Sequence, residues 1–145
     1  PWALTWDDEN YYMIAFDSDS KIIKHFRVDK IVSIETLSEK REGKELFEKF
    51  DMAVYSKKVF GMYGGEEVSV QLKCDKSLIG VIIDRFGREV MAIEYDDYFT
   101  VTVSVYQSPL FVSWIMGFGD KIEVLNPQSL RDTVKETAQK ISNLY

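Results

Sequence analysis

The chain has few of the side chains on which covalent and metal chemistry depends. It contains one cysteine, Cys74, and one histidine, His25, among 145 residues. A disulfide within the chain is therefore excluded, which fits a reducing, cytoplasmic setting. The ligand spacing of a zinc site is absent, and no Gly-x-Ser-x-Gly motif accompanies His25. We therefore expect that the protein is not an enzyme and that it needs no metal and no cofactor.

Long apolar runs are also missing, and so is a surplus of positive charge. No run approaches the ~18 residues of a membrane span, and no signal peptide is present, so we expect no membrane partner. The net charge of −6 argues against broad binding to duplex DNA, which needs a wide basic surface. A hydrophobic content of 46% predicts a folded core. The chain starts at Pro1 without a methionine, which suggests an excised fragment.

One basic stretch stands out in this acidic chain. The apolar run Asn10–Phe16 and the run Lys21–Val28 flank a polar cluster at residues 17–20, a pattern that predicts a β-hairpin. From residue 21 to residue 31 there is one acid, Asp29, and the cations are Lys21, Lys24, Arg27 and Lys30. The sequence thus predicts a local anion site on a positively charged strand.

The same stretch carries a family resemblance. Tyr11-Tyr12-Met13 followed by Lys24-His25-Phe26-Arg27-Val28-Asp29-Lys30-Ile31 resembles the two strand motifs of a WYL domain, which are Trp-Tyr-Leu and Arg-x-Phe-Arg-Leu-Asp-Arg-Ile. The resemblance implies an Sm-like or SH3-like antiparallel barrel with a regulatory site for a nucleic acid or nucleotide. Lys24 and Lys30 replace two arginines of the motif. A lysine ammonium is a point charge, whereas the planar arginine guanidinium can bind a phosphate through two parallel hydrogen bonds. Lysine therefore fixes the orientation of a phosphate less well.

The strand pattern of the first half agrees with a small barrel. Short strands are predicted at residues 3–6, 10–16, 21–28 and 30–36, with polar turns between them. An amphipathic helix is predicted over Glu45–Phe60 from apolar spacings of three and four residues. Gly64-Gly65 then marks the expected boundary between a WYL-type domain at 1–64 and a second domain at 65–145.

In the second half, predicted helices alternate with predicted strands. Asp75 and Ser108 are predicted helix caps, with Gly87 and Gly119 as helix stops. The predicted strands are 67–73, 90–94, 98–105 and 121–125, and the predicted helices are 77–86, 109–118 and a last one that opens at Asn126-Pro127. This β-α-β-β-α-β order predicts a ferredoxin-like α/β sandwich, so the fold class is α+β. The strings Ser113–Gly119 and Leu125–Arg131 are similar to elements of the WCX extension that follows WYL domains.

Alternation along the basic strand divides its side chains between two faces. Residues two apart share a face, so His25, Arg27 and Asp29 are expected together. Phe26 and Val28 are expected on the opposite, core face. The predicted ligand-binding residues are Tyr12, Lys24, His25, Arg27, Lys30 and Tyr11. An aromatic ring beside cations can stack a base and pair a phosphate, as in capture of single-stranded nucleic acid or a nucleotide.

Two readings of these residues remain open. Tyr12 is either a stacking platform or a half-buried strand aromatic, with the cations protecting a sheet edge. Asp29 has two possible roles. It orients the side chain of Arg27 or Lys30, or it is merely a polar residue that precedes the next predicted strand. The resemblance implies the sensing half of a bacterial helix-turn-helix regulator, a homodimer that reaches duplex DNA only through a domain missing from this chain.

The alternative function is a dimerisation module without a ligand. In that case three aromatic residues on the predicted helix at 109–118 would anchor the interface. These residues are Phe111, Trp114 and Phe118. Equally, the same three residues can belong to the core of the second domain.

Overall fold

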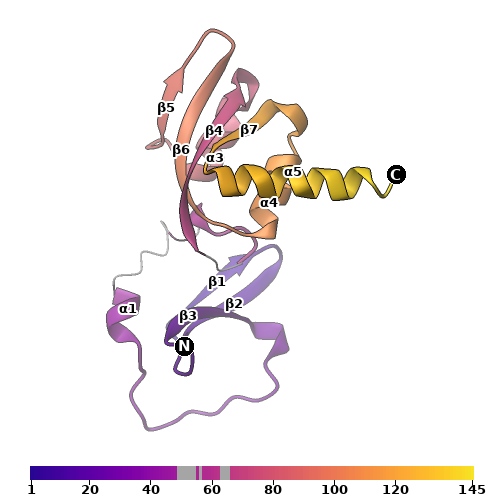
Figure 1. The fold of residues 1–145 in the computed structure, drawn as a ribbon. Coiled ribbons are helices and arrows are strands. Elements are labelled where there is room, and N and C mark those ends of the chain that lie inside the picture. The colour runs from indigo at the N-terminus through magenta and orange to yellow at the C-terminus, as the bar shows by residue number, and fades with distance from the viewer. Residues whose placement is uncertain (49–54, 56, 63–65) are drawn as a thin grey trace. The chain divides into compact units, whose positions relative to one another are not determined.

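The computed structural model of this protein describes residues 1–48, 55, 57–62 and 66–145. The chain divides into two compact units, Pro1–Tyr55 and Ser56–Tyr145 (Figure 1). The division predicted at residues 64 and 65 stays a prediction, because 63–65 lie outside the described residues. None of the helices in the described ranges is long and apolar enough to cross a bilayer.

The first unit is built on an antiparallel meander of three strands. Both turn residues between the first two strands, Asp8 and Glu9, have positive φ, at 44° and 60°. Such a two-residue turn matches the twist of a tight hairpin. The strands have the sheet order β1-β2-β3 and are β1 (Ala3–Asp7), β2 (Asn10–Asp17) and β3 (Ile22–Arg27). Three of the four strands predicted in this half are therefore confirmed.

The fourth predicted strand, at residues 30–36, is wrong. The 3-10 turn η1 (Val28–Lys30) follows β3, and the N–H of Ile31 donates to the carbonyl of Val28 at 3.1 Å. This turn interrupts the extended backbone, and residues 31–43 then lie outside helices and strands. Val32 is fully exposed. The described part of this unit is an open sheet, so the expectation of a closed barrel is also corrected.

Only part of the predicted helix at 45–60 can be compared. Helix α1 (Lys44–Glu48) begins near the predicted start, while 49–54 and 56 lie outside the described residues. Trp2 stacks on Phe47 of α1, with ring centroids 5.4 Å apart, and its indole N–H donates to the carbonyl of Glu42 at 2.8 Å. These contacts fasten the chain ahead of β1 to the segment around α1.

The second unit has the predicted element order, β-α-β-β-α-β followed by a terminal helix (Figure 1). Its four strands pair antiparallel in the order β5-β6-β4-β7. The helix after β4 leads to β5 at one edge, and the helix after β6 leads to β7 at the other edge. The elements are β4 (Glu67–Asp75), α3 (Ile79–Phe86), β5 (Met91–Glu94), β6 (Tyr98–Tyr106), α4 (Pro109–Met116), β7 (Ile122–Asn126) and α5 (Gln128–Ser142).

The predicted caps at Asp75 and Ser108 and the predicted stop at Gly87 are confirmed. The predicted stop at Gly119 is wrong, because α4 ends at Met116 with Gly117 as its C-cap. The Asp75 carboxylate accepts from the Ser77 N–H at 2.9 Å, at the 3-10 turn η2 (Lys76–Leu78) that leads into α3. The Ser108 hydroxyl accepts from the Phe111 N–H at 3.2 Å, which satisfies an otherwise free donor of α4. Gly87 ends α3 with φ of 90°, a left-handed conformation that favours glycine.

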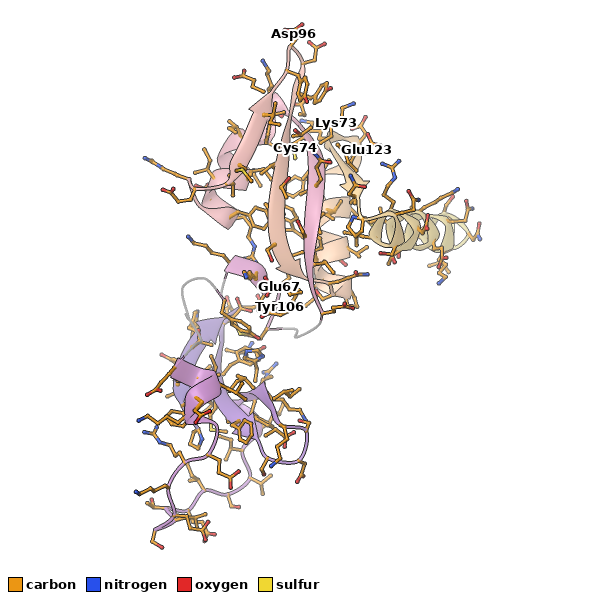
Figure 2. The ribbon with its side chains drawn as sticks, turned by 60° about the vertical axis from the view of Figure 1, so that its left-hand side comes forward. Glu67, Lys73, Cys74, Asp96, Tyr106 and Glu123 are labelled. Atoms are coloured by element: carbon orange, nitrogen blue, oxygen red, sulfur yellow. The ribbon has the colours of Figure 1, made fainter. Side chains whose placement is uncertain are left out.

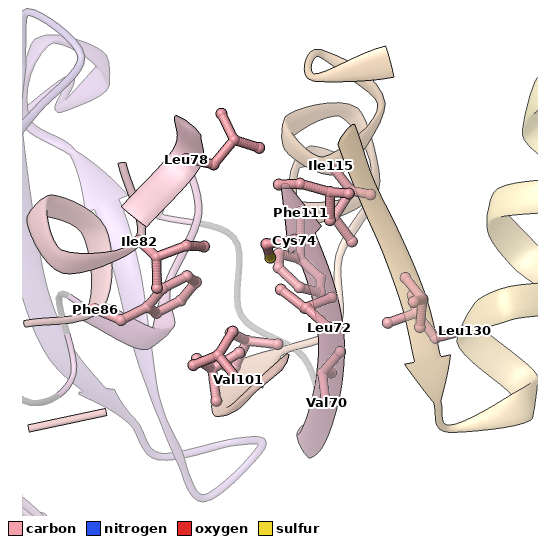
Figure 3. Close-up of a cluster of buried hydrophobic side chains, with 14 of the residues drawn as sticks. Val70, Leu72, Cys74, Leu78, Ile82, Phe86, Val101, Phe111, Ile115 and Leu130 are labelled. Carbon is pink, nitrogen blue, oxygen red and sulfur yellow. The ribbon is translucent and has the colours of Figure 1, made fainter. Parts of the chain in front are cut away.

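One face of the four-stranded sheet carries the core of this unit. Val70, Leu72 and Cys74 alternate along β4 and are fully buried among the side chains of Figure 3. Burial raises the pKa of the Cys74 thiol to about 11. Phe111 is fully buried beside Trp114, with ring centroids 6.2 Å apart. Phe111 therefore belongs to the core of this unit and is not an exposed interface anchor.

Candidate functional site

The register of the first hairpin decides which predicted site residues meet. Tyr12 of β2 lies directly opposite Arg27 of β3, and Ile14 lies opposite His25. Directly opposed residues project on the same face of a sheet. Tyr12, His25 and Arg27 therefore share one face of β2 and β3, as the sequence predicts for the aromatic ring and the cation.

Phe26 is not buried, although the sequence predicts that it lies on the core face. Ile14, on the face of His25, is fully buried, whereas Phe26 on the other face is 40% exposed. The ring of His25 lies against Tyr55, with centroids 5.2 Å apart and an interplanar angle of 31°. Val28 belongs to η1, where strand alternation no longer applies. The prediction that Phe26 and Val28 form the core face is therefore wrong.

Arg27 is held in a fixed orientation at the end of β3. Its Nε donates to Asp29 Oδ1 and its Nη2 to Asp29 Oδ2, both at 2.9 Å, and Nη2 also donates to Asn10 Oδ1 at 2.6 Å. The hydrogen bonds between them lower the pKa of the Asp29 carboxyl and raise the pKa of the Arg27 guanidinium. Asp29 thus orients Arg27, one of the two roles considered for it. The two Nη1 donors have no hydrogen-bond partner among the described residues.

Lys24 belongs to a different local structure. It lies opposite Ala15, on the face away from Arg27, and its ammonium forms an ion pair with Asp17. The Ser20 hydroxyl donates to the same carboxylate at 2.7 Å. Hydrogen bonding to Lys24, with Ser20 contributing, lowers the pKa of Asp17. Lys24 thus stabilises the hairpin turn, and the geometry does not bring it together with Arg27.

The remaining two predicted residues also lie apart from the shared face of Tyr12 and Arg27. Tyr11 points to the opposite face of β2 and meets Trp6 edge to face, with centroids 4.7 Å apart. Lys30 is the last residue of η1, and its ammonium is 3.9 Å from the Asp29 carboxylate. Lys30 is therefore near Arg27 through their common acid.

A cavity of about 1050 Å³ lies beside β3 within the first unit. Its wall combines strand residues with the irregular segment that follows η1, and it contains four cations and two acids. The cations are Arg27, Lys30, Lys40 and Arg41, the acids are Glu35 and Glu39, and the other lining residues are Pro1, Met13, His25, Phe26, Ile31, Val32, Ser33, Ile34, Thr36 and Leu37. The lining is thus mostly apolar with a positive surplus.

Three contributors to this site are missed by sequence reasoning. Lys40 and Arg41 come from the irregular segment between η1 and α1, and Asn10 is the first residue of β2. Arg41 lies over the Trp2 ring, 4.4 Å from its centroid, which holds the loop close to the N-terminal segment. The role of Asn10 could have been predicted from the sequence. Its side-chain carbonyl can accept a hydrogen bond, and it is the first residue of the strand that is predicted to pair with the strand of Arg27.

The arrangement offers positive charge, hydrogen-bond donors and apolar surface in one place. A guanidinium with further Nη1 donors, other cations and an apolar wall suits an anion that carries a flat or apolar part. Within the described ranges, no group of three His, Cys, Asp or Glu side chains could hold a metal ion.

The fold and the site together define an α+β protein with a cationic, apolar cavity in its first unit and an antiparallel α/β domain as its second. The model of the WCX domain family matches residues 66–142, and the chain belongs to this family. The match covers β4 to α5, the whole of the four-stranded sheet and its helices.

Comparison with individual proteins adds little beyond this family. No curated protein matches the chain. Among solved structures, the chain is similar to proteasome accessory factor B/C (PafBC) of Arthrobacter aurescens, with 14% sequence identity and a TM-score of 0.40. The similarity covers 92% of this chain and 20% of that chain, so the chain spans about a fifth of the length of PafBC.

Proposed function

We propose that the chain is the effector-sensing part of a bacterial transcriptional regulator. In this proposal residues 1–64 form a WYL-type sensing domain, and residues 65–145 form the WCX domain that transmits its state. Three observations support it: the WYL-like motifs of β2 and β3, the WCX family match, and the cationic cavity. Duplex DNA would be bound by a winged helix-turn-helix domain outside these residues, and two copies would act together.

The effector in this proposal is a single-stranded nucleic acid or a nucleotide-like anion. The observation that carries the proposal is the geometry of Arg27, whose guanidinium is fixed by Asp29 and Asn10, while its two Nη1 donors have no partner among the residues that the structure describes. A fixed fork loses little conformational entropy when it pairs with a phosphate. Tyr12 lies opposite Arg27 on the neighbouring strand and is not among the residues that line the cavity, so in this proposal its ring stacks a base beside the cavity.

The other predicted site residues differ in whether they contact the effector in this proposal. Lys30 and His25 line the cavity and contact the effector near Arg27. Lys24 and Tyr11 point to the other face of the hairpin. In this proposal they contact only an oligonucleotide that is long enough to wrap around the hairpin. A nucleotide would not reach them. The length of the bound ligand therefore decides whether Lys24 and Tyr11 contribute.

Fluorescence anisotropy with short labelled DNA and RNA single strands tests this proposal. We expect saturable binding that weakens as salt is raised, because phosphate contacts release counterions. Arg27→Ala should weaken binding by about 1.5–3 kcal/mol, the range for charge-assisted hydrogen bonds. Lys140→Ala is the matched control, since it removes one positive charge from exposed α5. Equal losses in both variants would mean that binding follows net charge alone and would refute the assigned site.

A further inference from the structure

The four-stranded sheet has two edges, β7 and β5, and among the described residues the β7 edge carries protecting contacts that the β5 edge lacks. At β7 the Arg131 Nη1 donates to the backbone carbonyl of Val124 at 2.6 Å and to the Glu123 carboxylate at 3.0 Å. Pro127, which has no N–H, follows the strand directly. A covered carbonyl and a proline are devices that block further strand pairing. The β7 edge is therefore closed to another strand.

The β5 edge has none of these devices. All four of its residues are exposed, and its apolar side chains Met91 and Ile93 are 78% and 59% exposed. In the described part of the chain β5 pairs with β6 alone. An exposed edge strand with apolar side chains is a template for pairing with another chain.

The hairpin geometry shows which backbone groups of β5 face outward. The Tyr95 N–H donates to the Tyr98 carbonyl at 2.8 Å across the turn, which makes these two a hydrogen-bonded pair. Hydrogen-bonded and non-hydrogen-bonded pairs alternate along an antiparallel ladder. Ile93 therefore bonds toward β6, and the N–H and C=O groups of Ala92 and Glu94 point to the open edge.

We propose that β5 pairs antiparallel with β5 of a second copy of this chain. With a twofold axis perpendicular to the sheet, the same face of β5 lies on the same side of the sheet in both copies. Two residues can therefore lie opposite each other only if their side chains project from the same face of β5, as those of Met91 and Ile93 do. Centring the pairing on Ala92 places Met91 opposite the second copy's Ile93. That pair is of the non-hydrogen-bonded kind, in which side chains come closest. Two apolar pairs then form, one on each side of the axis.

The charges at the two ends of β5 favour the same pairing. Arg88 lies in the turn before the strand, and Asp96 lies in the turn after it, at the tip of the β5–β6 hairpin (Figure 2). In the register centred on Ala92, Arg88 of each copy comes near Asp96 of the other. A surface that is complementary to itself in this way fits a second copy better than an unrelated partner.

The size of this contact sets its strength. A four-residue edge contributes much less than the ~1,200 Å² of a standard stable interface. The isolated chain should therefore dimerise weakly, with association visible only at raised protein concentration. The proposal rests on the sheet of the WCX domain and is independent of the effector site.

Sedimentation velocity of the 145-residue chain over a wide concentration series tests the proposal. We expect a monomer–dimer equilibrium that Ala92→Pro abolishes. Because the Ala92 N–H points outward, this proline spares the β5–β6 ladder, and circular dichroism should show an unchanged fold. Ile93→Lys should weaken the dimer by about tenfold or more, since the dimer loses two apolar contacts. Ile79→Lys is the matched control on α3, at 45% exposure.

A charge exchange makes the test specific to the register. Arg88→Asp should weaken the dimer, and Arg88→Asp combined with Asp96→Arg should restore it. A chain that stays monomeric at all concentrations overturns the proposal. A dimer that Ala92→Pro and Ile93→Lys leave unchanged also overturns it, because another face then holds the two copies together.

Discussion

Replacement of Phe111 by alanine distinguishes a core aromatic residue from an interface anchor. The Phe111 side chain is fully buried, and its ring lies 4.9 Å from Phe60 and 6.2 Å from Trp114, centroid to centroid. Removing a buried phenyl ring leaves a cavity that the neighbours fill only in part. A loss of about 3–5 kcal/mol in the free energy of unfolding is expected for Phe→Ala at such a site.

Chemical denaturation provides the assay for this loss. The indole N–H signal of Trp114, assigned in the NMR spectrum by Trp114→Phe, reports on the second unit by itself. Leu110→Ala is the control, since Leu110 is the neighbouring residue on α4 and is 44% exposed. We expect that control to cost less than about 1 kcal/mol. A small loss for Phe111→Ala, together with dissociation of a dimer, would refute the assignment of Phe111 to the core.

Three further predictions concern a cap, a glycine and the thiol. Ser108→Ala should lower the free energy of unfolding by about 1 kcal/mol, because the Phe111 N–H loses its acceptor, and Ser113→Ala on the same helix serves as the comparison. Gly43→Ala should destabilise the first unit by more than ~1 kcal/mol, measured by its thermal melt, since φ is +77° and a Cβ would meet the Phe16 ring at 2.4 Å. Native Cys74 should react with iodoacetamide at pH 8 at least ~100-fold more slowly than in guanidinium, since burial raises its pKa to about 11. Because the folded state keeps the thiol proton, the free energy of unfolding should also fall as the pH rises from about 9 towards 11.

The second unit could be predicted well from its sequence because its signals are local. Strict alternation marks β4, where Val70 and Leu72 are buried on either side of Gln71. The Ser108 cap and the Gly87 stop depend on neighbours one to four residues away. Strand order in the sheet is not local, but the β-α-β-β-α-β sequence of elements restricts it to few arrangements.

The first unit could be predicted only in part, because its features depend on distant residues. The β-branched residues Ile31, Val32 and Ile34 favour an extended backbone, but they do not indicate whether a strand lies beside them. Strand β2 is apolar on both faces, so alternation could not show that Ile14, on the face of His25, is buried while Phe26 is exposed. Lys40 joins the cavity through the path of a long loop, for which the local sequence has no signal.

An NMR titration of the chain with a short single-stranded oligonucleotide tests the claim that an anionic effector binds at the Arg27 end of β3. The claim predicts that the Arg27 Nε–H and the amide signals of Tyr12, His25 and Lys30 shift with added ligand, while the WCX residues 66–142 shift less. Shifts confined to the WCX residues, or no shift with oligonucleotides or nucleotides, would contradict the claim.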